Sequence, residues 1–330
     1  MSRSLRMCLR GTGHYVPANV RTNEYYTERL DTNDEWIVSR TGIRARHVVA
    51  DDQTTSTLGA AASRAALEDA GIPPEDLDLI LCATITGDCP FPATANFIQH
   101  ELGLAGIPSF DMSAACSGFV YALVTGATFL QTGHYRNVLV IGAETLTRVV
   151  DQEDRTSCIL FGDGAGAAVI SPTDDVDQGI INYSMGADPE HARLIWMPAG
   201  GASEPASHKT VNERLHYMRM HGRDVFKYAV PKMTTLLRNT LDEAGVTIDD
   251  VAMVIPHQSN ARMIESARER LGWPAEKMYV NIDRFGNTSA ASVPIALDEA
   301  RRDGRLEIGD LVLMLGLGAG ITYGTALVRL

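Results

Sequence analysis

Apolar residues recur along the chain in two alternating patterns, which predict alternating helices and strands. Residues 56–69 are rich in alanine and favour a helix. In residues 225–241 the apolar side chains recur at steps of three and four residues, as on one face of a helix. Short, almost entirely apolar runs occupy residues 77–84, 138–142 and 251–256. Such strands are typical of sheets covered by helices on both faces, so the pattern predicts an α/β fold.

One long repeat organises these elements. The sequence Ala-Leu-Glu-Asp-Ala-Gly ending at Gly71 recurs as Thr-Leu-Asp-Glu-Ala-Gly ending at Gly245, 174 residues later (245 − 71). The run Val138–Gly142 matches Val312–Gly316 at the same offset (316 − 142). Both Gly71 and Gly245 stand where the end of a helix favours a residue that tolerates positive φ. The matches indicate an internal duplication.

The duplication predicts two similar layered halves related by a pseudo-twofold axis, residues 1–172 and 173–330. Residues 171–179, rich in aspartate, form the natural seam between them. Residues 188–214 are polar and glycine-rich with little periodicity, and we expect a surface loop that covers a binding tunnel. Loops of this length inside compact domains are uncommon, and a functional role and simple mobility are both open.

Composition narrows the class of protein. With 45% hydrophobic residues the 330-residue chain is too apolar to be disordered, and its 41 acidic against 29 basic residues disfavour a nucleic-acid partner. Residues 1–16 lack the apolar block of a secretory signal, and the apolar stretch 119–130 falls short of the roughly 20 residues that span a bilayer. Five scattered cysteines without a C-x-x-C pair argue against a disulfide framework and a zinc site. We expect a cytoplasmic protein with no metal and no membrane contact.

Cys116 is the first candidate for chemistry. It lies among small residues between an expected strand and the apolar helix that runs to Leu130. The positive end of a helix dipole favours a thiolate, which predicts a pKa below the ordinary value of about 8.5. A buried structural thiol is the alternative, because free cysteine is among the most buried residue types.

His257 and Asn287 are the second and third candidates. His257 follows the strand ending at Pro256, where α/β sheets present catalytic groups, and Asn287 lies in a glycine-flanked loop before a helix. Each has an ordinary alternative, a local hydrogen bond for the histidine and a turn or cap for the asparagine. The duplication favours a catalytic role over these alternatives, because a pseudo-twofold axis would bring Cys116, His257 and Asn287 to one central site.

These motifs resemble one family along essentially the whole chain. The blocks Asp31–Ile37, Ala114–Phe119, Leu160–Gly166, Pro256–Asn260 and Gly286–Ser289, followed by a glycine loop at 316–320, are similar in order to those of β-ketoacyl-acyl-carrier-protein synthase III. This is a thiolase-like condensing enzyme of type II fatty-acid synthesis. The resemblance implies a thiolase-like fold.

The resemblance also implies a reaction. Cys116 would take the acyl group of a short acyl-CoA, and malonyl-acyl carrier protein would then condense with it and release carbon dioxide. His257 and Asn287 would hydrogen-bond the thioester oxygen as the enolate forms. The backbone amides of Cys116 and Ala319 would form an oxyanion hole. No cofactor is implied, since acyl-CoA is a substrate.

Further contacts follow from the resemblance alone. Phe91 and Leu317 would belong to the acyl pocket, Phe91 by reaching into the partner subunit of a homodimer. Leu317 departs from the usual aromatic, as does Tyr323 from the usual tryptophan, which puts acyl selectivity in question. CoA would contact Thr32, Trp36, Arg40, Arg155 and Asn260, and the acyl carrier protein would contact Lys227, Arg262, Arg268 and Arg270.

Two residues bear on these contacts. Between Arg268 and Arg270, the family has a further basic residue where this chain has Glu269, and without the resemblance Trp36 would be taken for a core or interface aromatic.

Three other interpretations of the function are weaker. A specialised acyltransferase of the same fold would pass the acyl group to oxygen or nitrogen without decarboxylation. A non-catalytic scaffold would more naturally have lost one of the three candidate residues. The glycine runs 162–166 and 316–320 lack the G-x-G-x-x-G spacing of a dinucleotide site, which argues against an oxidoreductase.

Overall fold

The computed structural model of the chain describes residues 4–330 and contains two five-stranded sheets. In the first sheet β5 runs parallel to its neighbours β6 and β7, while β8 runs antiparallel to β7 and β2. Strands β5, β7 and β8 are buried along their whole length, which explains their apolar sequences. The strand order is β2 (Cys8–Tyr15), β8 (Asp163–Ser171), β7 (Val138–Thr145), β5 (Leu79–Ala83), β6 (Ser109–Met112).

The second sheet repeats four strands of this arrangement with later residues but has no strand corresponding to β6, so β12 lies at its edge. Strand β12 runs parallel to β13, and β14 runs antiparallel to β13 and β9. Its fifth strand is instead β1, from the start of the chain, which pairs with β9 at the opposite edge. The strand order is β1 (Leu5–Arg6), β9 (Gly179–Ala187), β14 (Thr322–Arg329), β13 (Leu311–Leu317), β12 (Met253–Pro256).

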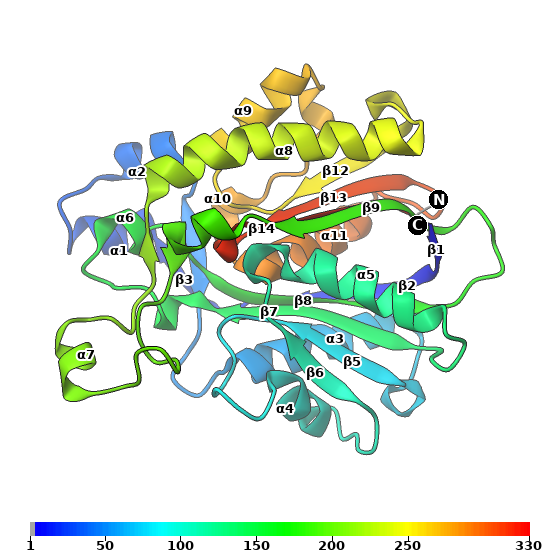
Figure 1. Cartoon of the computed structure of the whole chain (residues 1–330), viewed down its shortest axis with the longest axis horizontal. Helices are drawn as coiled ribbons and strands as arrows, with labels where there is room; N and C mark the ends of the chain where they lie inside the picture. Colours follow the sequence, from blue (N-terminus) through cyan, green and yellow to red (C-terminus); the bar gives the residue numbers. More distant parts are fainter. Residues whose placement is uncertain (1–3) are drawn as a thin grey trace.

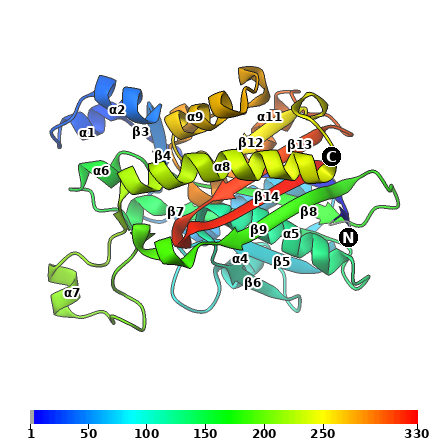
Figure 2. The same cartoon turned by 45° about the horizontal axis from the view of Figure 1, so that its top comes forward.

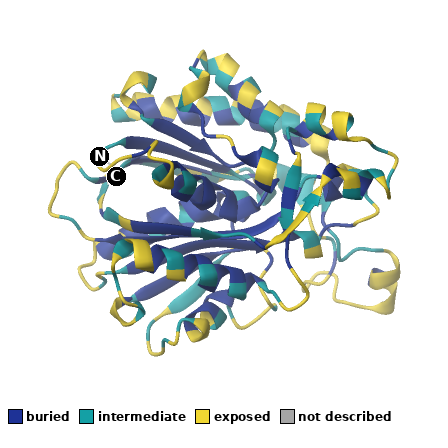
Figure 3. Ribbon diagram, turned by 180° about the vertical axis from the view of Figure 1, so that it is seen from behind, coloured by how far each residue is buried: buried dark blue, intermediate teal, exposed yellow. Residues whose placement is uncertain are grey.

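Helices form three layers around these sheets (Figure 1). Two helices, α5 (Gly118–Leu130) and α11 (Ser292–Arg302), lie between the sheets, and their buried faces pack with strands of both. The outer face of the first sheet is covered by α3 (Thr55–Ala70) and α4 (Thr94–Glu101), and that of the second by α8 (Gly222–Ala244) and α9 (Ala261–Leu271). Figure 3 shows the central sheets and helices as buried and the outer helix faces as exposed.

The offset found in the sequence recurs in the structure. Helix α3 ends at Gly71 with φ 64° and α8 ends at Gly245 with φ 71°, the left-handed conformation expected of both glycines. The central helices begin at Gly118 and Ser292, again 174 residues apart (292 − 118). The predicted α/β fold with a repeated layered arrangement is confirmed. The boundary at residue 172 stays a prediction, and β1 from residues 1–172 joins the later sheet.

Shorter elements gather at one end of the molecule (Figure 2). The expected loop 188–214 is partly regular: it contains η4 (Pro189–Leu194), β10 (Ile195–Trp196) and α7 (His208–Asn212). A serine cap with reciprocal hydrogen bonds to Thr210 explains why α7 forms within a polar stretch. The other short elements here are β3 (Asn19–Thr22), α1 (Asn23–Thr27), α2 (Asp34–Thr41), β4 (Ala45–Val48), α6 (Arg155–Cys158) and β11 (Arg219–Met220).

None of the helices in the described part of the chain combines the length and apolar character needed to cross a bilayer.

Candidate active site

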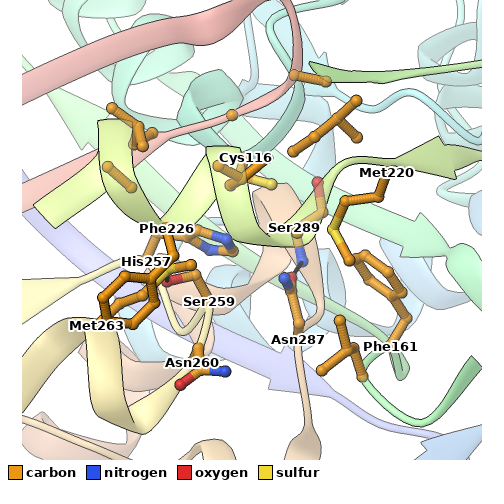
Figure 4. A pocket seen from close by; sticks show the side chains of 18 of the residues that line it. Cys116, Phe161, Met220, Phe226, His257, Ser259, Asn260, Met263, Asn287 and Ser289 are labelled. Atoms are coloured by element: carbon orange, nitrogen blue, oxygen red, sulfur yellow. Dashed lines mark hydrogen bonds between the residues drawn. The ribbon is translucent and has the colours of Figure 1, made fainter. Parts of the chain in front are cut away.

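Cys116, His257 and Asn287 line one cavity of about 480 Å³ (Figure 4). Cys116 lies in the 3-10 turn η2 (Ala115–Ser117) that leads directly into α5. His257 directly follows β12, and Asn287 lies between the short helix α10 (Ile282–Phe285) and the turn η7 (Ser289–Ala291). The fold thus brings together three side chains that are up to 171 residues apart in sequence (287 − 116).

Unusual backbone conformations surround Cys116. Three non-glycine residues here have positive φ, Ala115 at 46°, Ser289 at 48° and Ile321 at 48°. A Cβ atom at Gly318 would lie 2.5 Å from the backbone nitrogen of Cys116, so only glycine fits there. Such strain requires support from the surrounding fold and clusters at functional sites.

The backbone of Asn287 is fixed by the neighbouring half of the molecule. Its N–H donates to the carbonyl of Leu160 at 2.8 Å, and its carbonyl accepts from the N–H of Gly162 at 3.1 Å. Its side-chain Oδ1 accepts a hydrogen bond from the backbone N–H of Ser289 at 2.9 Å. The carboxamide oxygen is therefore engaged, and the Nδ2 group remains as a donor toward the cavity.

His257 is held by its backbone and by one ring nitrogen. Its N–H donates to the carbonyl of Leu315 at 2.6 Å, and Nδ1 lies 2.7 Å from Oγ of Ser292. Nε2 is buried and has no hydrogen-bond partner among residues 4–330. Burial lowers the pKa of His257 to about 3, so the imidazole is neutral near pH 7.

The hydroxyl of Ser292 determines whether Nε2 of His257 donates or accepts a hydrogen bond. It reaches two acceptors, Nδ1 of His257 and the carbonyl of Ser289 at 2.8 Å, but carries one proton. If that proton goes to Nδ1, the imidazole carries its own proton on Nε2 and can donate into the cavity. If it goes to the carbonyl, Nδ1 is the protonated nitrogen and Nε2 is an acceptor.

The electrostatic prediction for Cys116 was wrong in direction. The side chain is partly exposed to the cavity but surrounded by protein, and this burial raises the pKa of the thiol to about 12. A hydrogen bond from Ser289 lowers that pKa, and the nearby charge of Glu144 raises it further. Desolvation is the largest of these effects on the pKa of Cys116.

The turn that follows β13 lies against this cysteine. Ala319 belongs to η8 (Ala319–Ile321) and lines the cavity. It directly follows Gly318, where a Cβ atom would collide with the backbone nitrogen of Cys116. Leu317, one of the two predicted acyl-pocket residues, lines the same cavity, whereas Phe91 is 85% exposed and does not line it.

Three of the five predicted CoA contacts, Trp36, Arg40 and Asn260, line the cavity, whereas Thr32 and Arg155 are not among its lining residues. The guanidinium groups of Arg155 and Arg40 lie 5.0 Å and 5.2 Å from the ring centroid of Trp36, so a purine can enter between Trp36 and Arg155 only if that arginine moves. Asn260 caps α9 and donates from Nδ2 to the carbonyl of Arg40 at 3.1 Å. The Thr32 hydroxyl has no partner among the described residues.

The four predicted basic residues differ in their surroundings. Lys227 and Arg262 are exposed at the cavity mouth, and Arg270 is exposed on α9. Arg268 is mostly covered and donates twice to the carboxylate of Glu265, at 2.6 Å and 2.8 Å, which neutralises its charge. Arg223, which sequence reasoning missed, also lines the mouth.

Two further residues were missed in the sequence. Ser289 lines the same cavity as Cys116 and donates to the buried carboxyl group of Glu144 at 3.0 Å, but neither residue stands in a motif that indicates a proton-handling group. The one signal was a buried acid at the end of an apolar strand, where a charge is costly.

The two sheets enclose a pair of central helices, and a cysteine, a histidine and an asparagine line one cavity. This combination defines a thiolase-like condensing enzyme. A sequence profile of 3-oxoacyl-[acyl-carrier-protein] synthase III matches residues 110–189, and the profile of its C-terminal part matches residues 241–330. A β-ketoacyl-[acyl-carrier-protein] synthase III of Desulfitobacterium hafniense is 50% identical over 97% of this chain and 96% of its own. The chain belongs to the β-ketoacyl-[acyl-carrier-protein] synthase III family of acyltransferases.

Solved structures agree with this assignment. The crystal structure of 3-oxoacyl-[acyl-carrier-protein] synthase III from Aquifex aeolicus VF5 has a TM-score of 0.90 at 44% identity, covering 98% of this chain and 100% of that one. The priming β-ketosynthase of the R1128 polyketide pathway also has a TM-score of 0.90, at 36% identity, covering 100% of this chain and 98% of that one.

Proposed function

We propose that this protein condenses a short acyl-CoA with malonyl-acyl carrier protein through an acyl group carried on Cys116, and so initiates type II fatty-acid synthesis. The observation that carries the proposal is the cavity itself, in which one thiol faces a carboxamide donor and a buried imidazole. A nucleophile and two hydrogen-bonding groups on opposite walls suit the two halves of such a reaction.

In the first half-reaction the sulfur of Cys116 attacks the thioester carbonyl of acyl-CoA, and the proton of its thiol passes to solvent. The carbonyl oxygen gains negative charge, and we assign its stabilisation to the backbone amides of Cys116 and Ala319. Collapse of the tetrahedral intermediate breaks the bond to CoA, whose thiolate takes a proton from solvent. The acyl group remains on Cys116 as a thioester.

In the second half-reaction malonyl-acyl carrier protein loses carbon dioxide. The electron pair of the broken carbon–carbon bond becomes an enolate, whose oxygen accepts hydrogen bonds from Asn287 Nδ2 and from Nε2 of His257 in its Nε2-protonated form. Its carbon then attacks the acyl group, and the released sulfur of Cys116 regains a proton from solvent. Each donor contributes about 3–4 kcal/mol if it is comparable to one donor of an oxyanion hole.

The mouth suits two phosphorylated carriers. Arg40, Arg223, Lys227 and Arg262 surround it, although the chain as a whole is acidic. Local cations of this kind attract the phosphates of CoA and of an acyl carrier protein's prosthetic arm. Phe91, exposed on its loop, is the residue we assign to the interface of a homodimer.

Intact-protein mass spectrometry tests the first half-reaction. Incubation with acetyl-CoA is expected to add one acetyl group, and Cys116→Ser to abolish the addition. Cys8→Ser is the matched control, because Cys8 is a partly exposed cysteine away from the cavity. A wild-type protein that stays unmodified with every short acyl-CoA would refute the proposal. Carbon dioxide release on adding malonyl-acyl carrier protein separates condensation from acyl transfer to oxygen or nitrogen.

A further inference from the structure

A buried carboxyl group lies beside the cavity and has no role in the steps above. Glu144 is on β7, and its exposed fraction is 0%. Among residues 4–330, no arginine, lysine or histidine forms an ion pair with it. A carboxyl group is costly to bury, so its presence here requires a reason.

Two parts of the chain donate hydrogen bonds to this carboxyl group. From the segment that follows β5, the hydroxyls of Thr84 and Thr86 and the backbone N–H of Ile85 donate to Oε2. From the turn η7, the hydroxyl of Ser289 donates to Oε1 at 3.0 Å. Glu144 therefore ties η7, which belongs to the later half of the chain, to the first sheet.

Every polar group of Ser289 is engaged. Besides the hydroxyl, its backbone N–H donates to Oδ1 of Asn287 at 2.9 Å, and its carbonyl accepts from the hydroxyl of Ser292 at 2.8 Å. Figure 4 shows Ser289 next to Asn287. The backbone φ of Ser289 is 48°, a conformation that a non-glycine residue holds only when its surroundings impose it. The hydrogen bond to Glu144 is the contact that holds its side chain.

The contact with Ser289 determines which end of the Asn287 carboxamide faces the cavity. The two ends are an acceptor, Oδ1, and a donor, Nδ2, and a half-turn of the group exchanges them. The backbone hydrogen bonds of Asn287 to Leu160 and Gly162 fix its main chain but not this rotation. In the part of the chain that the structure describes, the N–H of Ser289 is the donor that holds Oδ1.

We propose that Glu144 is a positioning residue for the condensation step. By holding the hydroxyl of Ser289, it keeps the backbone N–H of that residue against Oδ1 of Asn287, so that Nδ2 points at the enolate. Without this anchor the positive φ of Ser289 relaxes and the N–H turns away, because an L-residue in that conformation is strained. The inference rests on the proposed function for the reaction, whereas the orientation of the carboxamide can be observed without it.

The test measures the two half-reactions separately in Ser289→Ala. This variant loses the hydrogen bond to Glu144 and keeps its own backbone groups. We expect the kcat of condensation to fall by about tenfold, the contribution of one ordinary hydrogen bond, with the KM for malonyl-acyl carrier protein unchanged. Acylation of Cys116 by acetyl-CoA is expected to stay within about twofold of wild type. A variant that condenses like wild type, or that loses both half-reactions to the same extent, overturns the proposal.

Two substitutions of Glu144 test the anchor from the other side. Glu144→Leu offers no acceptor, so it is expected to lose condensation by about tenfold, as Ser289→Ala does. In Glu144→Gln the amide oxygen faces the backbone N–H of Ile85, which cannot turn away, and the NH2 group donates to the hydroxyl oxygen of Ser289 instead.

The anchor therefore persists in Glu144→Gln, which is expected to condense within about threefold of wild type. Equal losses in the two Glu144 variants would mean that the charge matters and not the anchor. A Glu144→Leu enzyme that condenses like wild type would mean that Ser289 acts without Glu144. Either result contradicts the positioning role. If Glu144→Leu fails to fold, Ser289→Ala and the following cycle decide.

A double-mutant cycle shows whether Ser289 acts through the carboxamide. In Asn287→Ala there is no carboxamide to orient, so adding Ser289→Ala is expected to slow condensation by less than about twofold. A further loss of about tenfold would mean that Ser289 acts on the substrate itself, and the proposal would be wrong. Ser63→Ala is the matched control, since it also removes a buried hydroxyl that donates a hydrogen bond, to the carbonyl of Gly59 in α3 away from the cavity. It is expected to leave both half-reactions unchanged.

Crystal structures separate this inference from the proposed function. In wild type the backbone nitrogen of residue 289 is expected near 2.9 Å from Oδ1 of Asn287, and in Ser289→Ala beyond about 3.5 Å. An unchanged contact in the variant refutes the positioning role whatever reaction the enzyme catalyses. A lengthened contact in a protein whose wild type is never acylated refutes the proposed function, while the role of Glu144 in orienting the carboxamide stands.

Discussion

Gly142 lies directly against the backbone of Ala290: a Cβ atom at position 142 would be 2.3 Å from the Ala290 carbonyl oxygen. Their counterparts one repeat apart are Gly316 (142 + 174) and Cys116 (290 − 174). A Cβ atom at Gly316 would lie 3.0 Å from the carbonyl oxygen of Cys116 and 2.5 Å from the Cα of Ser117. The same close approach therefore occurs twice, and one of the two positions carries the nucleophile.

The first prediction concerns the close approach of Gly316 to the backbone of Cys116. Gly316→Ala is expected to displace the turn that holds Cys116 and to reduce acylation by about 100-fold, because small misplacements of reacting groups are costly. Gly201→Ala is the control, since a Cβ atom there meets nothing within 4 Å. Acylation is measured per folded molecule, with thermal unfolding as the check on folding. Unchanged acylation in Gly316→Ala would contradict the structural argument.

The second prediction separates the half-reactions. Asn287→Asp replaces the donor that faces the cavity by an acceptor, so condensation is expected to fall by about 10²- to 10³-fold while acylation of Cys116 remains. His257→Ala is expected to have the same division of effects. Acyl-enzyme mass and product formation are measured in parallel. If acylation fell as steeply as condensation, the assignment of these residues to the enolate would be wrong.

The third prediction concerns the proton on the imidazole of His257. Ser292→Ala removes the hydroxyl that lies 2.7 Å from Nδ1, so the ring loses its fixed orientation. Condensation is expected to decrease by about tenfold, as for the loss of a group that orients a histidine. Ser292→Thr keeps the hydroxyl and is expected to restore part of the rate. A Ser292→Ala enzyme with wild-type condensation would show that Ser292 does not position the ring.

The fourth prediction concerns CoA. Trp36→Ala is expected to raise the KM for acetyl-CoA by about tenfold with little change in kcat, since stacking on the nucleotide is remote from the reacting carbon. With acetyl-N-acetylcysteamine, a thioester without the nucleotide, wild type and variant are expected to be equal. A KM increase for both substrates would mean that Trp36 acts on the structure of the cavity.

The fifth prediction concerns stability and pH. The pKa of Glu144 is raised in the folded state, so the folded protein binds more protons than the unfolded chain between the ordinary value of 4.5 and about 7. Its contribution to the unfolding free energy therefore becomes less favourable as the pH rises through that window. The stability of Glu144→Gln relative to wild type is expected to improve from about pH 5 to about pH 8, measured by urea unfolding at both values. A constant difference would mean that the pKa of Glu144 is not raised.

The pKa shift of His257 has the opposite effect on how stability depends on pH. Its folded pKa of about 3 lies below the ordinary 6.5, so the unfolded chain binds the extra proton and this residue destabilises the fold as the pH falls through that window.

The sequence predicted the repeated framework well, because each repeat carries its own local signals. The apolar strands and the terminal glycines Gly71 and Gly245 depend on neighbouring residues, so they can be recognised without a structure. Asn287 and His257 could be placed at one site because the repeat fixed their positions relative to Cys116.

Properties that arise from packing could not be predicted in the same way. The pKa of Cys116 depends on how completely the fold surrounds it, and a helix N-terminus gives no information on that. The hydrogen bond from Ser289 to Glu144 joins residues 145 positions apart (289 − 144), and no motif encodes it. Arg268 was expected to offer an unpaired charge at the surface, but it forms an ion pair with Glu265, one turn away on the same helix.

The edge strand β1 ties the chain's beginning to a part of the molecule made much later. Leu5 pairs with Ile180, so during synthesis the first strand has no strand to pair with until about half of the protein has left the ribosome. Pairings across such sequence distances form slowly. Cutting the chain at the seam would leave the later fragment without its outermost strand, and for this reason the two halves do not correspond to two pieces that could be separated cleanly.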